Sequence, residues 1–213
     1  MTEVVIIDYG LGNLLSVERA LVAVGGKPII SADPAVLIAA KKLILPGVGA
    51  FEAGMQGLKE RSLLKPLLAT VKSGTPLLGL CLGMQLLFDN SEEFGLHSGL
   101  GLIPGTVKQL TPLPTEPAKI PHIGWNKLQP LGKNDWGGTV LDGVKTGDMV
   151  YFVHSFAPYP PAADTTLAQT IYGGQSFASV VRQGNVIGTQ FHPEKSGPVG
   201  QIILKNFLTT TPG

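Results

Sequence analysis

The chain has 213 residues, of which 44% are hydrophobic and 15% charged, and its formal net charge is +1. Its lysines and arginines are dispersed, so no basic patch predicts a nucleic-acid partner. No uncharged apolar run is long enough to cross a membrane, and the first residues lack the features of a signal peptide, so none is expected. A single cysteine excludes an internal disulfide and argues against a cysteine-based metal site. We therefore expect no metal or other cofactor and a reducing, cytoplasmic location.

The first 90 residues alternate short apolar runs with amphipathic stretches. Strands are predicted at 4–8, 27–30, 42–45 and 76–80, and helices at 14–24, from 34, at 51–71 and at 84–88. Asn13 can cap the first helix and Asp33 the second, while Ser62 and Pro66 are expected to interrupt the third. Strands and helices that alternate at these lengths predict an α/β fold: one doubly wound, mostly parallel sheet with helices on both faces.

The second half is rich in proline between residues 100 and 131, where short strands and turns are expected rather than helices. Further short strands are predicted at 150–156, 167–171, 176–182 and 186–190, with a hairpin turn at 183–185 and a closing helix at 197–208. These strands add an antiparallel part to the parallel sheet. The sequence has no internal repeat and no domain boundary, so residues 1–213 are predicted to form one domain.

The stretch Gly79-Leu80-Cys81-Leu82-Gly83 stands between a predicted buried strand and a helix. It has the Gly-x-nucleophile-x-Gly pattern of a nucleophile elbow, with cysteine where hydrolases carry serine. The glycines allow the strand to turn abruptly into the helix, so that Cys81 lies at a helix N-terminus, where the thiolate is favoured. A small buried cysteine packed beside a helix would give the same pattern, and the elbow alone does not separate the two.

A second motif, His192-Pro193-Glu194, follows a predicted strand near the end of the chain. In an extended segment residues two apart point to the same side, so His192 and Glu194 are expected side by side, with Pro193 resisting a helical conformation. A carboxylate beside an imidazole fixes its tautomer and stabilises its cation. With Cys81 the pair predicts a Cys–His–Glu triad in which His192 activates the thiol and later protonates the leaving group. Taken singly, a surface histidine and a solvated glutamate are the alternatives.

A third motif, Pro46-Gly47-Val48-Gly49, directly follows a predicted strand. In a parallel sheet its loop lies at the same carboxyl edge as the elbow, where ligands bind. Exposed N–H groups of this turn, together with the N–H of Leu82, could form an oxyanion hole. A tight strand-to-helix turn that uses glycine for its own geometry is the alternative.

The segments around Cys81 and His192, in this order and at this separation, resemble those of the class I (triad-type) glutamine amidotransferase family. Four further stretches extend the resemblance to the glutaminase subunits of imidazole glycerol phosphate synthase in histidine biosynthesis: residues 8–13, 45–49, 121–126 and 151–155. The resemblance runs nearly end to end and implies a flavodoxin-like amidotransferase fold. It also implies that Cys81 attacks the side-chain amide of glutamine, giving a glutamyl thioester and ammonia, while His192 moves the protons and Glu194 orients it.

The same resemblance implies the residues that surround the substrate. The peptide groups at Val48, Gly49 and Leu82 would stabilise the oxyanion. Glutamine would be held by Gly49, Gln85, His154 and Ser155. Phe156 stands where a tyrosine is often found in the family, so no hydroxyl is expected there.

A partner is implied as well: a (β/α)8-barrel cyclase subunit in a heterodimer. It would use the ammonia to form imidazole glycerol phosphate and an aminoimidazole carboxamide ribotide. Asn13, Trp125 and Lys195 would lie at or near the partner face. Without the resemblance they would be interpreted as a helix cap, a partly buried aromatic residue and a solvated lysine. Residues 131–147 match nothing distinctive, and no role is assigned to them.

Three alternatives stay open from the sequence. Another amidotransferase glutaminase would carry the same triad, and only residues 9–13 and 121–126 separate it. A cysteine peptidase or glyoxalase-like enzyme would also use a cysteine elbow, but would not need His-Pro-Glu near the C-terminus. The non-enzymatic alternative is an α/β binding module with a vestigial site.

Overall fold

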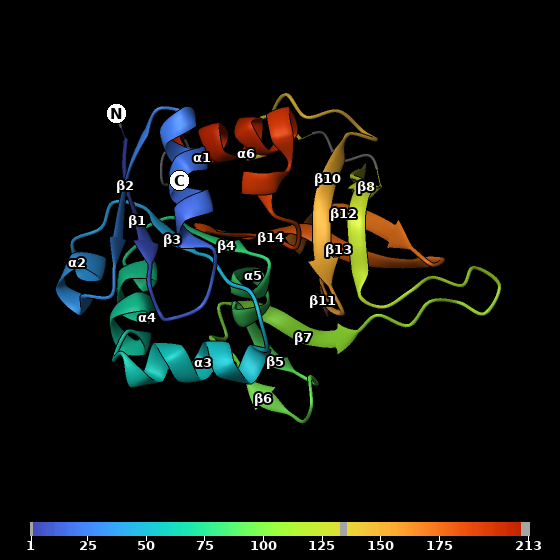
Figure 1. Ribbon diagram of the computed structural model, residues 1–213, viewed down its shortest axis with the longest axis horizontal. Coiled ribbons are helices and arrows are strands. Elements are labelled where there is room, and N and C mark those ends of the chain that lie inside the picture. Colours follow the sequence, from blue (N-terminus) through green and yellow to red (C-terminus); the bar gives the residue numbers. More distant parts are fainter. Residues whose placement is uncertain (1, 133–135, 210–213) are drawn as a thin grey trace.

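The computed structural model describes residues 2–132 and 136–209 (Figure 1). The first part contains β1 (Thr2–Ile7), α1 (Leu14–Ala23), β2 (Gly26–Ser31), α2 (Pro34–Ile38), β3 (Leu43–Leu45), α3 (Phe51–Glu60), α4 (Leu64–Lys72), β4 (Leu77–Leu80) and α5 (Leu82–Leu86). It continues with β5 (Phe88–Ser91), β6 (His97–Ser98), β7 (Ile103–Gln109), β8 (His122–Lys127) and β9 (Gln129–Pro130). The last part contains β10 (Met149–His154), β11 (Phe156–Tyr159), β12 (Thr166–Tyr172), β13 (Gln175–Gln183), β14 (Val186–Thr189) and α6 (Gly197–Thr209), with 3-10 turns at Ala163–Thr165 and Pro193–Lys195.

The main sheet has eight strands in the order β2-β1-β3-β4-β14-β13-β12-β9. Neighbours from β2 to β14 are parallel, whereas β14, β13, β12 and β9 pair antiparallel. The parallel part has the 2-1-3-4-5 strand order of flavodoxin-like, doubly wound folds, which place ligands at the carboxyl ends of the strands. The predicted α/β fold, with a parallel sheet extended by antiparallel strands, is confirmed.

Alternation along the strands divides the hydrophobic core into two layers. Val4 and Ile6 of β1 pack on the face covered by α1 and α6. Val5 and Ile7 pack on the opposite face, which α2, α3 and α4 cover. Figure 1 shows the two helical layers on either side of the sheet. Since successive strand residues point to opposite faces, a strand buried on both faces needs the unbroken apolar run that these parallel strands have.

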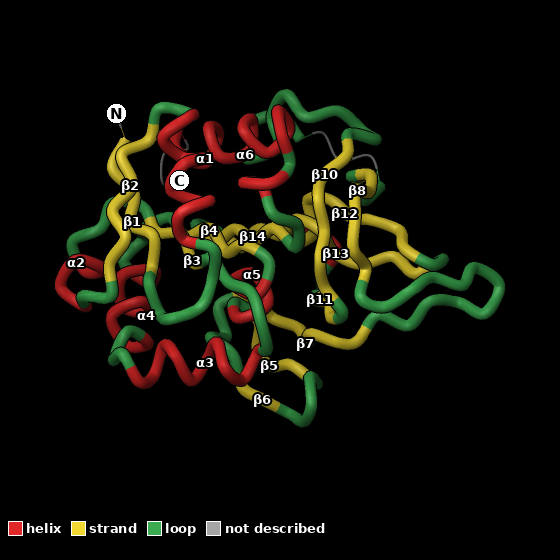
Figure 2. The backbone as a smooth tube through the Cα atoms, in the orientation of Figure 1, coloured by secondary structure: helices red, strands yellow, loops and turns green. Residues whose placement is uncertain are grey.

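Two smaller sheets complete the fold. One has four strands in the order β11-β7-β5-β6, and the other is the antiparallel pair β8–β10. Figure 2 shows β8 and β10 side by side at the end of the molecule away from α2. The pair is attached to β12 of the main sheet: the Thr170 hydroxyl donates to the Lys127 carbonyl at 3.0 Å, and the Asn126 amide to the Ile171 carbonyl at 3.0 Å.

Three local predictions need correction. Ser62 (φ 58°) separates α3 from α4 as expected, but Pro66 lies inside α4. It is tolerated in the first turn, where the missing N–H has no intrahelical partner. The elbow helix ends at Leu86, and Phe88 opens β5, because its backbone pairs with β7. The strand expected at 150–156 is two strands, since β10 ends at His154 and β11 begins at Phe156 in another sheet.

Within the segment to which the sequence assigned no role, residues 133–135 lie outside the described residues. Trp136 and Leu141 are buried in the core layer of α6, and the Trp136 indole N–H donates to the Leu167 carbonyl at 2.7 Å. The segment therefore contributes to the core. In the described ranges, no helix combines the length and the apolar character that a membrane span requires.

Replacing Gly83 with alanine should destabilise the protein by about 3 kcal/mol or more. A Cβ at this position would overlap the carbonyl oxygen of Leu45, which belongs to a buried strand and cannot move away cheaply. Gly74→Ala is the matched control, because its φ of 98° is strained for alanine but nothing lies within 4 Å of the added Cβ. The control should cost only about 1–2 kcal/mol. Urea unfolding of both variants measures the difference, and equal losses would contradict the close contact.

Candidate active site

The three sequence motifs meet at the carboxyl edge of the parallel sheet. Cys81 directly follows β4, the loop 46–49 follows β3, and His192 comes three residues after β14. β3 and β14 are the two neighbours of β4, so the end of each lies about 5 Å from the end of β4. The edge is where ligands bind in sheets of this topology.

Cys81 occupies a nucleophile elbow. Its backbone has φ 53° and ψ −109°, a region that L-residues rarely adopt. The Cys81 N–H donates to the Thr189 carbonyl at 2.8 Å, which ties the elbow to β14. Gly79 lies so close to the peptide between Gly83 and Met84 that a Cβ would be 2.7 Å from the Gly83 carbonyl oxygen. The strand, turn and helix that the motif requires are therefore all present, with Cys81 only 5% exposed.

His192 and Glu194 form a buried hydrogen-bonded pair. His192 Nδ1 lies 2.7 Å from Glu194 Oε1, and their side chains are 4% and 2% exposed. The extended conformation predicted for this segment is wrong, because Pro193 opens a 3-10 turn. Proline suits the first position of such a turn, since its fixed φ is helical and no N–H is needed there. The His192 N–H donates to the Tyr151 carbonyl at 3.0 Å, so β10 holds the turn in place.

The surroundings of His192 favour its cation. Burial opposes the charge, but the Cys81 thiol and the Glu194 carboxylate outweigh this and raise the pKa of His192 to about 10. With Nδ1 bonded to Glu194, Nε2 is the ring nitrogen left for the thiol; it is buried and has no hydrogen-bond partner of good geometry among the described residues. An imidazolium beside a sulfur stabilises the thiolate, the nucleophilic form of cysteine.

The loop 46–49 is packed directly against the elbow. A Cβ at Gly47 would overlap the Tyr9 hydroxyl and lie 2.9 Å from Leu82 Cβ. Tyr9 donates to the Pro46 carbonyl at 2.6 Å, and burial, with a smaller effect of Cys81, raises the pKa of this hydroxyl, so it stays a neutral donor. At the other end of the loop, Glu93 accepts from the Phe51 N–H at 2.6 Å. The sequence analysis did not identify Tyr9 or Glu93 as supports of this loop.

Val48 and Gly49, the expected oxyanion donors, lie at the exposed crest of the loop, and Gly49 has a φ of 107°. Leu82, the third expected donor, opens α5 and is buried. The packing of Gly47 on Leu82 brings the loop and the start of α5 together. Among the described residues, no cluster of three or more histidine, cysteine or acidic side chains could hold a metal ion.

Two glutamines form a chain of hydrogen bonds that starts at the Phe156 carbonyl and ends at the nucleophile, whose thiol also donates to the Val153 carbonyl at 3.8 Å. Gln85 Nε2 donates to the Phe156 carbonyl at 2.9 Å and to Gln190 Oε1 at 3.1 Å. Gln190 Nε2 in turn donates to Cys81 Sγ at 3.8 Å, which is within range for sulfur. The sequence identified Gln85 but not Gln190, although Gln190 opens the stretch that leads into His192.

The other two expected glutamine contacts differ in their surroundings. Both ring nitrogens of His154 are engaged inside the protein, Nδ1 with the Phe156 carbonyl at 2.8 Å and Nε2 with His122 Nδ1 at 3.0 Å. Ser155 lines a cavity of about 340 Å³. Its other lining residues are Glu92, Phe94, Gln109, Ile120 and Phe156.

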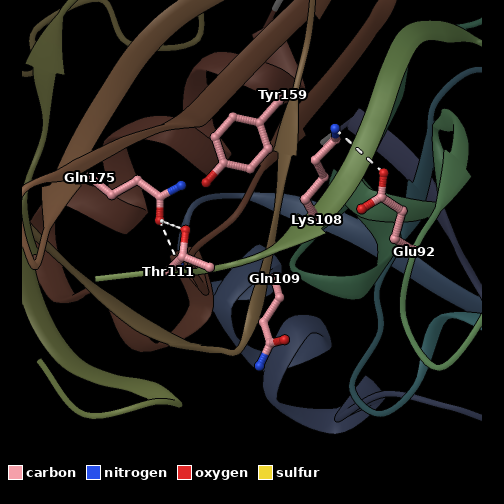
Figure 3. A pocket seen from close by; sticks show the side chains of 6 residues that line it. All are labelled: Glu92, Lys108, Gln109, Thr111, Tyr159 and Gln175. Atoms are coloured by element: carbon pink, nitrogen blue, oxygen red, sulfur yellow. Dashed lines mark hydrogen bonds and ion pairs between the residues drawn. The ribbon is translucent and has the colours of Figure 1, made fainter. Parts of the chain in front are cut away.

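A larger hollow of about 510 Å³ shares Glu92 and Gln109 with that cavity (Figure 3). In it, Lys108 pairs with Glu92 at 3.4 Å, and the Gln175 side-chain oxygen accepts from the Thr111 N–H at 2.7 Å. Four of its lining residues are thus paired with one another, whereas the buried Tyr159 hydroxyl has no hydrogen-bond partner among the described residues, and no triad residue lines the hollow. We assign no chemistry to this hollow.

Of the residues expected at a partner face, two come together. The Trp125 ring packs edge-on against the Tyr151 ring, with centroids 6.1 Å apart. Lys195 Nζ lies 5.9 Å from the centroid of the Tyr151 ring. Trp125 is 52% exposed. Asn13 is exposed and accepts from the Ser16 N–H at 3.3 Å, so it caps α1, the role that its position alone suggested.

Together, the parallel sheet and the buried His–Glu pair beside an elbow cysteine define an α/β enzyme of the cysteine-triad type. A family model described as glutamine amidotransferase class-I matches residues 5–211. Solved structures share this fold. PurLQS from Thermotoga maritima superposes with a TM-score of 0.71 at 19% identity, covering 98% of each chain. A crystal structure of a glutamine amidotransferase gives 0.70 at 20% identity, covering 92% of this chain and 93% of that one.

Curated relatives show higher sequence identity. Imidazole glycerol phosphate synthase subunit HisH 1 of Legionella pneumophila is 45% identical, over 98% of this chain and 99% of its own. HisH subunits of Syntrophotalea carbinolica and Geobacillus thermodenitrificans are each 46% identical, over 96% and 100% of this chain and 98% of their own. The chain therefore belongs to the class I glutamine amidotransferase family and, within it, to the HisH glutaminase subunits of imidazole glycerol phosphate synthase in histidine biosynthesis.

The pH titration of His192 tests the electrostatics of the site. An ordinary histidine loses its proton near pH 6.5, whereas His192 should remain doubly protonated at pH 8 and titrate near pH 10. Glu194→Gln keeps the shape of the side chain but removes its charge, so the midpoint should fall. Nitrogen-detected NMR of the imidazole rings measures both. A midpoint near 6.5 in the wild-type protein would contradict the charged pair.

Proposed function

We propose that this chain hydrolyses glutamine to glutamate and ammonia through a thioester on Cys81, and delivers the ammonia to a cyclase subunit. The observation that carries the proposal is the buried His192–Glu194 pair beside an elbow cysteine. Membership in the HisH subunits supports glutamine as the substrate. A cytoplasmic location, expected from the single thiol, belongs to the same proposal.

In the proposed reaction the Cys81 thiolate attacks the side-chain amide carbon of glutamine. The C–N bond then breaks, and the nitrogen takes the proton that His192 carried on Nε2, so that ammonia leaves and a glutamyl thioester remains. His192 next accepts a proton from water as the water attacks the thioester. The C–S bond breaks, and glutamate and the thiolate–imidazolium pair are restored. Glu194 bonds Nδ1 throughout, which keeps Nε2 directed at the reacting atoms.

The tetrahedral intermediates carry negative charge on the former amide oxygen. The N–H of Leu82 suits this charge, because it belongs to the first residue of α5 and has no partner within the helix. The peptides at Val48 and Gly49 complete the proposed oxyanion hole. The contact of Gly47 with Leu82 supports this placement, since it sets the loop against the start of the helix.

The glutamine contacts implied by the family have different parts in this proposal. Both N–H groups of Gln85 are used within the protein, so Gln85 meets the substrate through its carbonyl oxygen. Gly49 contributes backbone beside the oxyanion donors. Ser155 lines the cavity of about 340 Å³, and in this proposal it contacts the amino-acid end of the substrate. His154, whose ring is engaged on both sides, supports the wall of the site.

The outer face of the β8–β10 pair is the proposed docking surface for the cyclase, a (β/α)8 barrel in a one-to-one heterodimer. Ile123, Trp125 and Met149 are 59%, 52% and 43% exposed on this face, and Tyr151 and Lys195 adjoin them. A contiguous apolar patch containing aromatic residues is typical of protein–protein interfaces. The bond from the His192 N–H to the Tyr151 carbonyl joins this face to the triad, so a partner seated here would lie close to the released ammonia.

Glutamate release from glutamine tests the proposal. It should be weak for the chain alone and should rise strongly when a cyclase subunit and its nucleotide ligand are both present. Cys81→Ser should lower the rate by roughly 10³-fold or more, and Glu194→Gln by roughly 10²- to 10⁴-fold. Glutamate release that does not change when the cyclase is added would indicate that the chain serves another amidotransferase pathway. A wild-type rate equal to that of Cys81→Ser would contradict the proposed glutamine hydrolysis by Cys81.

The docking surface can be tested separately. Trp125→Ala should weaken binding to the cyclase by about 2 kcal/mol, or roughly 30-fold in Kd, as truncation of a central interface aromatic does. Ile38→Ala is the control, because Ile38 is 63% exposed on α2, at the opposite end of the molecule (Figure 1). Titration calorimetry measures both. Unchanged binding of Trp125→Ala would exclude this face from the interface.

A further inference from the structure

A pair of buried histidines has no part in the proposed chemistry. His122 and His154 lie directly opposite each other in the β8–β10 register, on the inner face of that pair. They are 2% and 6% exposed, and His122 Nδ1 lies 3.0 Å from His154 Nε2. The His122 ring is stacked between Tyr172 and Phe152, with centroids 3.9 and 4.8 Å away. Burying two imidazoles in an aromatic core is costly unless their ring nitrogens make hydrogen bonds.

Chemistry fixes the direction of these bonds. The Phe156 carbonyl can only accept, so His154 Nδ1, whose nitrogen lies 2.8 Å from the carbonyl oxygen, carries the proton. In the neutral ring Nε2 is then an acceptor, and His122 Nδ1 must donate to it. His122 Nε2 accepts in turn from the Asn126 side-chain amide at 3.4 Å. Burial lowers the pKa of His122 to about 4 and that of His154 to about 3, which keeps both rings neutral at physiological pH.

The chain of bonds continues to the nucleophile. The Phe156 carbonyl that His154 holds also accepts from Gln85. The second N–H of Gln85 donates to the Gln190 oxygen, so the Gln190 nitrogen must point the other way, toward Cys81 Sγ. The Phe156 carbonyl accepts from both His154 and Gln85, so it joins the two histidines to the two glutamines, and on the glutamine side each amide is oriented by the acceptor it meets, as far as the sulfur.

We propose that His122 and His154 are positioning residues that hold the Phe156 carbonyl in the place where it orients the Gln85 and Gln190 amides, and that they thereby aim an N–H at the Cys81 sulfur. An N–H donor stabilises a thiolate, so the pair favours the reactive form of the nucleophile without touching substrate. The role deepens the proposed glutaminase function and rests on it. The titratable groups that face Cys81 directly are His192 and Tyr9, and neither is altered in the test.

Alkylation of Cys81 by iodoacetamide tests the role without glutamine, and the chain has no other cysteine to react. His154→Leu removes the donor to the Phe156 carbonyl. The alkylation pH profile should shift to higher pH, so that the reaction is slower on the acidic side of the profile, because the thiolate loses a donor that stabilises it. His154→Asn should restore most of the rate, because its amide nitrogen takes the place of Nδ1. His122→Leu, one bond further away, should have a smaller effect in the same direction.

Phe152→Leu is the matched control. It loosens the same aromatic cluster between the two histidines but leaves every bond of the chain intact. It should lower the stability to urea while leaving the alkylation midpoint unchanged. A midpoint that stays at the wild-type value in His154→Leu would overturn the proposal, as would an equal shift in His154→Leu and Phe152→Leu.

The tautomers give a second test, which needs no variant and decides the matter if His154→Leu fails to fold. Nitrogen NMR of the wild-type protein at pH 7 should show His122 and His154 neutral, each with its proton on Nδ1. A proton on Nε2 of either ring, or a charged ring, would contradict the direction of the chain. Neither experiment depends on turnover. If the protein gives the expected result in both tests but has no glutaminase activity, the positioning role is supported and only the proposed reaction is wrong.

Discussion

The active site depends on a backbone segment that the rest of the molecule must restrain. The conformation of Cys81 costs a non-glycine residue about 1–3 kcal/mol, and an isolated peptide would not keep it. Here the bond from Cys81 to Thr189 holds one side of the elbow, and the contact of Gly83 with the Leu45 carbonyl holds the other. Both restraints come from strands that neighbour β4. The same packing that stabilises the sheet therefore brings the thiol, the histidine and the loop after β3 to one edge.

Features encoded over a few neighbouring residues could be predicted from the sequence. The parallel strands are unbroken apolar runs, and the elbow and the His-Pro-Glu motif each lie within five residues. The prediction failed where one residue type suits two conformations. The fixed φ of Pro193 fits an extended segment and also the first position of a 3-10 turn, and contacts with β10 select the turn. His192 and Glu194 still meet, because both conformations permit a contact between residues two apart.

Relations that depend on strand register could not be predicted. His122 and His154 were in stretches singled out by resemblance, but their contact exists only because β8 and β10 pair in one particular register. The support of the loop 46–49 by Tyr9 and Glu93 likewise joins residues about 40 positions apart. A single sequence carries no signal for such pairs, since neither partner has an unusual neighbourhood of its own.

The small size of the β8–β10 sheet has a consequence for how the protein loses activity on heating. The backbone ladder of this pair is confined to its two strands, and the pair is held to the main sheet by side-chain bonds to β12 and by the packing of its inner face, whereas two strands alone are marginally stable. It can therefore open as a cooperative unit while the eight-stranded sheet stays folded. Its opening would break the bond between Tyr151 and His192 and separate the two paired histidines. Thermal inactivation should accordingly begin below the temperature of global unfolding and be reversed on cooling.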